Sequence, residues 1–155
     1  MDWTTLALSW TLWTPLIGAL LLLFVPKGQD LIARAVALTV TLITLGMAGV
    51  LFLGFNPNLT GYQFVERFAW LPDYGVSYFL GIDGVSLWLV GLTALLSVFA
   101  VALSFNIQER VREFLIWMLA LETALLGVFM ALDVILFYVF FELTLVPSYF
   151  LISLW

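Results

Sequence analysis

The stretch FYVFFELTLVPSYFLISLW, residues 137–155, decides how this chain must fold. It is apolar and almost as long as the run of about 20 helical residues that crosses a bilayer core of about 30 Å. It nevertheless contains an acid, Glu142, and a proline, Pro147. An acid at the centre of a membrane helix costs about 3 kcal/mol on insertion scales, so its presence requires a functional or structural explanation.

The composition of the whole chain agrees with a membrane setting. Hydrophobic residues make up 65% of the 155 and charged residues only 10%, whereas soluble domains are about half apolar and about a quarter charged. The apolar runs do not alternate with polar residues, which excludes a membrane β-barrel. The sequence has no cysteine or histidine, which excludes disulfides, thiolate metal sites and histidine-based catalytic dyads. We expect a lipid bilayer around the chain and no nucleic-acid partner.

The positions of the charges predict an all-α, polytopic membrane protein with five transmembrane helices in one domain, residues 1–155. Between residues 56 and 79 the sequence becomes rich in Asn, Pro, Gly and Tyr, which predicts an extramembrane loop. Its Trp70, Tyr74 and Tyr78 suit the interfacial belt of a membrane protein. The predicted helices cover residues 6–25, 35–55, 84–105, 114–132 and 134–155.

Two acids lie where predicted helices begin. Asp83 precedes Gly84 at the start of the third helix, where a carboxylate typically accepts hydrogen bonds from the first backbone N–H groups. Asp133 lies between the fourth and fifth helices. We therefore interpret Asp83 as a helix N-cap and Asp133 as the turn between two antiparallel helices.

The basic residues give the chain a predicted orientation. Lys27, Arg34, Arg110 and Arg112 fall on one side of the membrane when five helices are counted, and Arg67 alone falls on the other. Loops rich in Lys and Arg remain on the cytoplasmic side. The sequence therefore predicts a cell inner (cytoplasmic) membrane, or an equivalent energy-converting membrane, with the N-terminus outside.

Two acids are predicted to lie near the middle of the bilayer. Counted from Asp133 at about 1.5 Å per helical residue, Glu142 lies about 13 Å along the fifth helix and Glu122 about 16 Å along the fourth. A buried glutamate can keep its proton up to a pH of about 8 or 9 unless a cation is near. Both are therefore candidate proton-transfer residues, with Glu142 first and Glu122 as a second protonatable site.

The residues around Glu142 support its interpretation as a proton-transfer residue. At about 100° per residue, Tyr138, Tyr149 and Ser153 fall on the same helical face as Glu142, so they are candidate polar contacts. Pro147 lacks an N–H and leaves one backbone carbonyl without its helical donor, which predicts a helix break close to the acid. Weakened membrane helices are tolerated where protein or water fills the gap, as at an ion site.

Structural roles are the alternative for both acids. Glu142 could hydrogen-bond to a neighbouring helix without taking part in transport. Glu122 has Thr123 beside it but neither a proline nor a comparable polar stripe. If the two carboxyl groups faced each other, repulsion would make them titrate as a coupled pair that holds one proton.

Two stretches of the sequence are similar to a known family. GVFMALDVILFYVFFELTLVPSYFLISLW, residues 127–155, and YFLGIDGVSLWLVGLTALL, residues 78–96, resemble the antiporter-like subunits of proton-pumping NADH:quinone oxidoreductase, respiratory complex I. The resemblance is greatest to the chain M (mitochondrial chain 4) family. PLIGALLLLFVP, residues 15–26, matches the same family more loosely. Subunits of sodium/proton antiporters and membrane-bound hydrogenases are similar.

The resemblance implies a fold and a function. The fold would be the N-terminal part of an antiporter-like helical bundle, in a non-redox subunit that translocates protons while quinone is reduced elsewhere. No cofactor would bind this chain; NADH, flavin, iron–sulfur clusters and quinone would bind other subunits. The partners would be other membrane-arm subunits of a hetero-oligomeric complex. The alternatives are a subunit of a sodium/proton antiporter or membrane-bound hydrogenase, and a purely structural membrane-arm subunit.

The resemblance also implies a role for Glu142. In the family, the glutamate at this position of the motif pairs with a lysine on a later helix, and proton uptake depends on that ion pair. The only lysine here, Lys27, lies at a helix end. We therefore expect the lysine partner to come from outside these residues and expect no pumping by this polypeptide alone.

Overall fold

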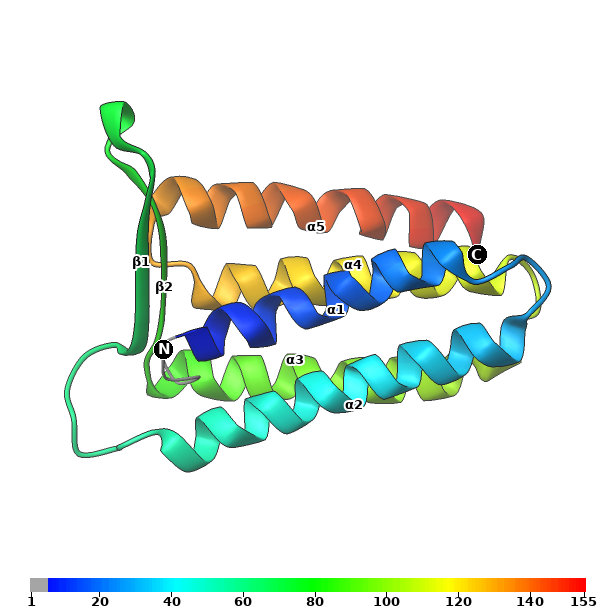
Figure 1. Ribbon diagram of the computed structural model, residues 1–155, viewed down its shortest axis with the longest axis horizontal. Helices are drawn as coiled ribbons and strands as arrows, with labels where there is room; N and C mark the ends of the chain where they lie inside the picture. The colour runs from blue at the N-terminus through cyan, green and yellow to red at the C-terminus, as the bar shows by residue number, and fades with distance from the viewer. Residues whose placement is uncertain (1–5) are drawn as a thin grey trace.

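Five long helices lie side by side in the computed structural model, which describes residues 6–155 (Figure 1). Each is long and apolar enough to cross a membrane, which confirms the predicted five transmembrane helices. The N-terminal end of the described chain and its C-terminus lie at opposite ends of the helical bundle (Figure 1). The helices are α1 (Ala7–Phe24), α2 (Asp30–Gly54), α3 (Gly84–Leu103), α4 (Val111–Met130) and α5 (Val134–Leu154).

Two helices begin earlier than the hydrophobic pattern indicates. α2 begins at Asp30 where residue 35 was predicted, and α4 begins at Val111 where residue 114 was predicted. Apolar runs report the part of a helix that lies in hydrocarbon, whereas backbone hydrogen bonding continues into the polar boundary. Charged residues are stable there, and an acid in a first turn, such as Asp30, also interacts favourably with the helix dipole.

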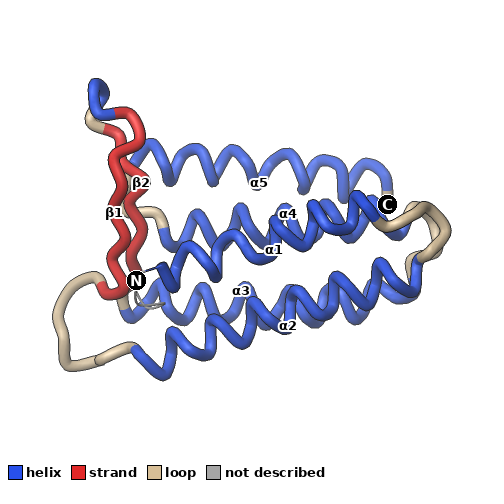
Figure 2. The backbone as a smooth tube through the Cα atoms, in the orientation of Figure 1, coloured by secondary structure: helices blue, strands red, loops and turns tan. Residues whose placement is uncertain are grey.

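The predicted loop at residues 56–79 contains an antiparallel β-hairpin, so describing this whole segment as a loop was wrong. β1 (Gln63–Leu71) pairs with β2 (Val76–Ile82) in a two-stranded sheet that runs across one end of the helices (Figures 1 and 2). A short 3₁₀ turn over Pro72–Tyr74 joins the strands. Gly75 closes the turn with a φ of 68°, a conformation that glycine adopts without steric cost.

Backbone contacts join the hairpin to the connection between α4 and α5. The N–H of Leu132 donates to the carbonyl of Phe79 at 2.8 Å. The N–H of Ser77 donates to a carboxylate oxygen of Asp133 at 3.0 Å. A two-stranded hairpin is only marginally stable by itself in water, so these contacts help to hold it against the helix ends.

Helix α4 is central to the packing and α5 lies at the edge. α4 packs against each of the other four helices, whereas α5 packs mainly against α4. Only three residues of α5 are buried, namely Leu136, Phe140 and Pro147. Most of the surface of α5 is therefore not covered by the described part of this chain.

Close approach of α4 and α5 depends on Gly127. A Cβ atom at this position would lie 2.3 Å from two ring carbons of Phe140, so an alanine would displace the ring. We expect Gly127→Ala to lower the free energy of unfolding by about 1 to 3 kcal/mol, as overpacking does elsewhere. Unfolding in mixed micelles titrated with sodium dodecyl sulfate measures this change.

Gly46→Ala is the matched control for this prediction. Gly46 also lies in a membrane helix, and a Cβ atom there would have no neighbour within 4 Å. Alanine favours a helix over glycine by about 1 kcal/mol, so this variant should be neutral or slightly more stable. Equal stability of the Gly127→Ala and Gly46→Ala variants would contradict the packing role of Gly127.

Candidate functional site

The acid of the fifth helix lies on an exposed polar face. Glu142 is exposed and occupies the middle of α5. Tyr138 is 59% exposed, Tyr149 is 67% exposed, and Ser153 is exposed as well. All four side chains therefore remain accessible after α5 has packed against α4.

Among residues 6–155, no basic side chain lies near the middle of α5, where Glu142 is found. The only basic residues lie in the turn after α1, in the first turns of α2 and α4 or beside them, and in β1: Lys27, Arg34, Arg110, Arg112 and Arg67. A carboxylate in hydrocarbon is stable only when it is neutralised or paired. A cationic partner for Glu142 is therefore not among the basic side chains of residues 6–155.

Pro147 lies in an uninterrupted part of α5. The helix continues from Val134 to Leu154, so α5 is not broken at Pro147 as the sequence predicts. Pro147 is buried and lines a cavity of about 210 Å³ together with residues of α1 and α4, including Trp13 and Thr123. Membrane helices tolerate proline where neighbouring helices lie against it, so the helix persists although the carbonyl of Leu143 has no N–H donor at position 147.

Glu122 has a different environment from Glu142. Its side chain is 2% exposed, and neither carboxylate oxygen has a hydrogen-bond partner in the described part of the chain. It lines a cavity of about 330 Å³ between α3 and α4, to which Thr93 and Ser97 also contribute. The Ser97 hydroxyl lies near the carboxylate without meeting the geometry of a hydrogen bond.

The structure does not bring Glu122 and Glu142 together. The cavity beside Glu122 is lined only by α3 and α4, whereas Glu142 lies on the exposed side of α5. Toward α1 and α5, helix α4 presents Ala120, Thr123 and Ala124, and Glu122 is rotated away from this face. A coupled pair of these two acids is therefore not supported, because similar depth does not fix helix rotation.

Glu66, an acid of the hairpin, is buried, although no local pattern in the sequence singles it out. Its side chain is 3% exposed, and its carboxylate accepts from the N–H of Leu8 at 2.8 Å and from the N–H of Ser9 at 3.1 Å. The hydroxyl of Ser9 donates to the same carboxylate. Leu6, which precedes α1, makes no side-chain cap. Glu66 therefore caps α1 from the hairpin and places a negative charge at the positive end of the helix dipole.

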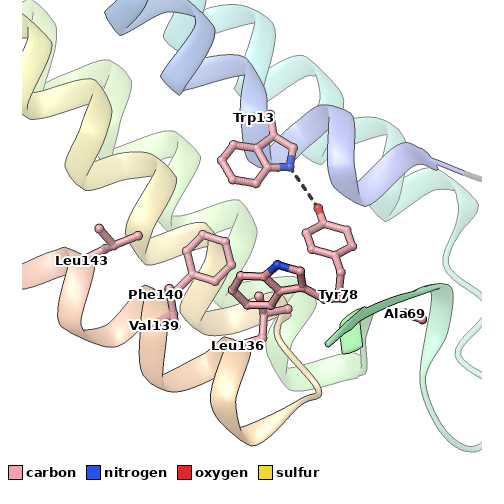
Figure 3. Close-up of a pocket in the computed structure, with 8 residues that line it drawn as sticks. Trp13, Ala69, Tyr78, Leu136, Val139, Phe140 and Leu143 are labelled. Carbon is pink, nitrogen blue, oxygen red and sulfur yellow. Dashed lines mark hydrogen bonds between the residues drawn. The ribbon is translucent and has the colours of Figure 1, made fainter. Parts of the chain in front are cut away.

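Tyr78 connects this cap to the interior of α1. Its hydroxyl lies 2.9 Å from the Ser9 hydroxyl and accepts from the indole N–H of Trp13 at 3.0 Å (Figure 3). Burial raises the pKa of Tyr78 above its ordinary value of 10.0, so the phenol remains protonated at neutral pH. Tyr78 thus belongs to a hydrogen-bonded network that links β2 and α1, as well as lying near the predicted membrane interface.

A turn signal in the sequence could have revealed the hairpin, and with it this network. Pro72, Asp73 and Gly75 are typical turn residues. The residues on either side of them are rich in aromatic and branched side chains, which favour strands. The burial of Glu66, by contrast, depends on contacts with a helix 57 or 58 residues away in sequence, which no local pattern encodes.

Both acids at helix starts are N-caps, and Asp133 has a second role in binding the hairpin. Asp83 is an N-cap as predicted, because it accepts from the N–H of Ser86 at 2.7 Å, and this hydrogen bond lowers the pKa of its carboxyl group. Asp133 caps α5 by accepting from the N–H of Ile135 at 2.9 Å and also binds the hairpin. The hydrogen bond from Ser77 is the main cause of the lowered pKa of Asp133.

The loops that carry most of the positive charge meet at one end of the bundle. Arg34 donates to the carbonyl of Ile107 at 2.6 Å, and Arg112 donates to the carbonyl of Val25 at 2.8 Å. The turn after α1 and the turn after α3 are therefore adjacent, at the end opposite the hairpin (Figure 1). Within residues 6–155, no group of acidic side chains is arranged to hold a metal ion.

No protein-family model matches the chain. Individual proteins do match it, and the two described next have related names. It is 41% identical over 145 residues to NADH-quinone oxidoreductase subunit M of Rhodobacter capsulatus, covering 91% of this chain and 28% of that protein. It is 36% identical over 149 residues to NADH-ubiquinone oxidoreductase chain 4 of Arabidopsis thaliana, covering 96% of this chain and 30% of that protein. The chain spans less than a third of the length of these relatives.

Solved structures agree with the sequence comparison. A chain of respiratory complex I from Thermus thermophilus matches with a TM-score of 0.77 and 28% identity, over 95% of this chain and 29% of that one. A chain of the membrane-bound sulfane sulfur reductase, an archaeal respiratory membrane complex, shares the fold with a TM-score of 0.75 at 23% identity, over 96% of this chain and 23% of that one. Sequence and fold together therefore relate this chain to the subunit M and chain 4 family of NADH-quinone oxidoreductases, of whose members it matches a part.

Proposed function

We propose that this chain is part of a proton-translocating membrane-arm subunit of an NADH:quinone oxidoreductase, in which Glu142 takes up and releases the proton. The observation that carries this proposal is the position of Glu142 in the middle of α5, on an exposed face and without a basic side chain of residues 6–155 beside it. The similarity to subunit M over 91% of the chain supports the same assignment. Quinone reduction, which would drive the transport, takes place elsewhere in the complex.

Proton transfer at Glu142 depends in this proposal on a cation that approaches and withdraws. An opposite charge within about 4 to 6 Å favours the ionised carboxylate, and its withdrawal favours the protonated acid. A lysine from outside the described residues is the proposed partner. Tyr138, Tyr149 and Ser153 supply polar contacts or water sites along the same face, and Pro147 leaves an acceptor carbonyl near the acid.

The proposed setting is a hetero-oligomeric complex in an energy-converting membrane. Other membrane-arm subunits, or further helices, would cover the exposed face of α5. NADH, flavin, iron–sulfur clusters and quinone would bind elsewhere in the complex. The end of the bundle with Lys27, Arg34, Arg110 and Arg112 would face the cytoplasm or its equivalent, so the N-terminus would lie outside.

Copurification tests membership of the complex. An affinity-tagged form of the chain, isolated from its own membranes in a mild detergent, should copurify with an NADH-oxidising activity measured with an artificial electron acceptor. The control is a tagged five-helix membrane protein without this similarity, isolated from the same membranes. Recovery of the chain without any enrichment of NADH oxidation over that control would contradict the proposal.

A further inference from the structure

The cavity between α3 and α4 contains a carboxyl group that the proposed role of Glu142 does not use. Glu122 is 2% exposed, and both of its carboxylate oxygens lack hydrogen-bond partners in the described chain. Most of the cavity wall is apolar, with leucines on both helices. An ionised Glu122 would place an unpaired negative charge in apolar surroundings, which is strongly unfavourable.

The ionisable side chains of the neighbouring elements do not line this cavity. Within their bounds, α1 and α3 contain no ionisable side chain. α2 carries Asp30 and Arg34 near its start, β2 carries Tyr78, and α5 carries Tyr138, Glu142 and Tyr149; none of them lines the cavity. Arg112 and Glu113 lie in the first turn of α4 and do not line the cavity either. No cation of the described chain therefore lines the cavity beside Glu122, and no second acid of the cavity competes for its proton.

Two hydroxyl groups lie in the cavity with Glu122, and they differ in availability. The hydroxyl of Thr93 donates to the carbonyl of Leu89 at 2.8 Å, so it has no proton left to donate to Glu122. The hydroxyl of Ser97 lies near Glu122. Ser97 is therefore the better placed of the two to exchange a hydrogen bond with the carboxyl group.

We propose that the cavity between α3 and α4 is a second proton-binding site, in which Glu122 is a neutral acid at neutral pH and exchanges its proton beside Ser97, independently of Glu142. The geometry that carries the proposal is a buried, unpartnered carboxyl group in a cavity of about 330 Å³ that contains no residue of α5. The proposal goes beyond the role of Glu142, because it holds whether or not Glu142 carries protons.

Dicyclohexylcarbodiimide tests this site, because it reacts with protonated carboxyl groups in apolar surroundings. Membranes that contain the complete assembly are treated at several values between about pH 6 and about pH 9, the range in which a buried glutamate titrates. Mass spectrometry then locates the adducts. We expect an adduct on Glu122 that decreases as the pH rises. Glu122→Gln should lose that adduct, and Glu142→Gln should keep it.

Two further variants test the role of Ser97. Ser97→Ala removes a hydroxyl that can stabilise the ionised carboxylate, so labelling of Glu122 should persist to higher pH. Thr93→Val is the matched control, because its hydroxyl is bonded to its own helix, and it should leave the pH dependence unchanged. Glu109, which is exposed, should react with a water-soluble carbodiimide and an amine but not with dicyclohexylcarbodiimide.

Three results would overturn this proposal. They are the absence of an adduct on Glu122 at every pH, the loss of that adduct in Glu142→Gln, and equal pH profiles for Ser97→Ala and Thr93→Val. Proton transport measured in the same Glu142→Gln membranes reports separately on the proposed function. A failure of one proposal is therefore distinguishable from a failure of the other.

Discussion

Replacing Glu142 by glutamine is expected to abolish proton transport by the assembled complex while the subunit still inserts and assembles. Glutamine keeps nearly the same size and retains hydrogen-bonding groups, but it cannot take up and release a proton at neutral pH. It also removes the charge that a cationic partner would recognise. Proton uptake by inverted membrane vesicles after addition of NADH measures the effect, and native gel electrophoresis measures assembly.

Ser148→Ala is a suitable control in the same helix. The hydroxyl of Ser148 donates to the carbonyl of Thr144 at 2.7 Å, so its loss should leave proton transport unchanged. Glu142→Leu separates the transport role from a structural one. If the acid only holds neighbouring helices together, Glu142→Gln should be mild in function and Glu142→Leu should mainly reduce assembly. Normal pumping by Glu142→Gln would reject the transport role.

Replacing Glu66 by alanine is expected to lower the free energy of unfolding by about 3 kcal/mol. Hydrogen bonds to a charged group contribute about 1.5 to 3 kcal/mol, and loss of a helix cap costs about 1 kcal/mol. The variant leaves the N–H groups of Leu8 and Ser9 without their acceptor. The start of α1 should therefore fray, and the hairpin should lose its attachment to α1.

Hydrogen exchange locates this effect, and denaturant titration measures its size. Backbone amides in the first turn of α1 should exchange faster in Glu66→Ala than in the unmodified chain, whereas amides in the middle of α3 should not change. Glu66→Gln keeps one acceptor oxygen and should lose about half as much stability as Glu66→Ala. Asp73→Asn is the control, since Asp73 is exposed in the turn of the same hairpin. Equal effects of Glu66→Ala and Asp73→Asn would contradict the capping role.

The hairpin marks the limit of what local patterns predict in this chain. Residues 63–82 combine strand-forming side chains with a turn at Pro72 and Gly75, so pairing of the strands was predictable in principle. The same segment also contains Glu66 and Arg67, which are charged and would therefore be expected to be exposed to solvent. Only the packing of the hairpin across the end of α1 converts Glu66 from a surface acid into a buried helix cap.

The sequence by itself determined the number of membrane helices, the positions of Glu122 and Glu142 along them, and the resemblance that relates the chain to its family. These properties depend on the length and composition of single segments, because each helix satisfies its own backbone hydrogen bonds in lipid. Only the tertiary structure decided which way each acid faces, with Glu122 in a cavity beside α3 and Glu142 on the uncovered side of α5. Helix rotation follows from contacts between segments, such as that between Gly127 and Phe140, and a hydrophobic run that is apolar on all sides does not specify them.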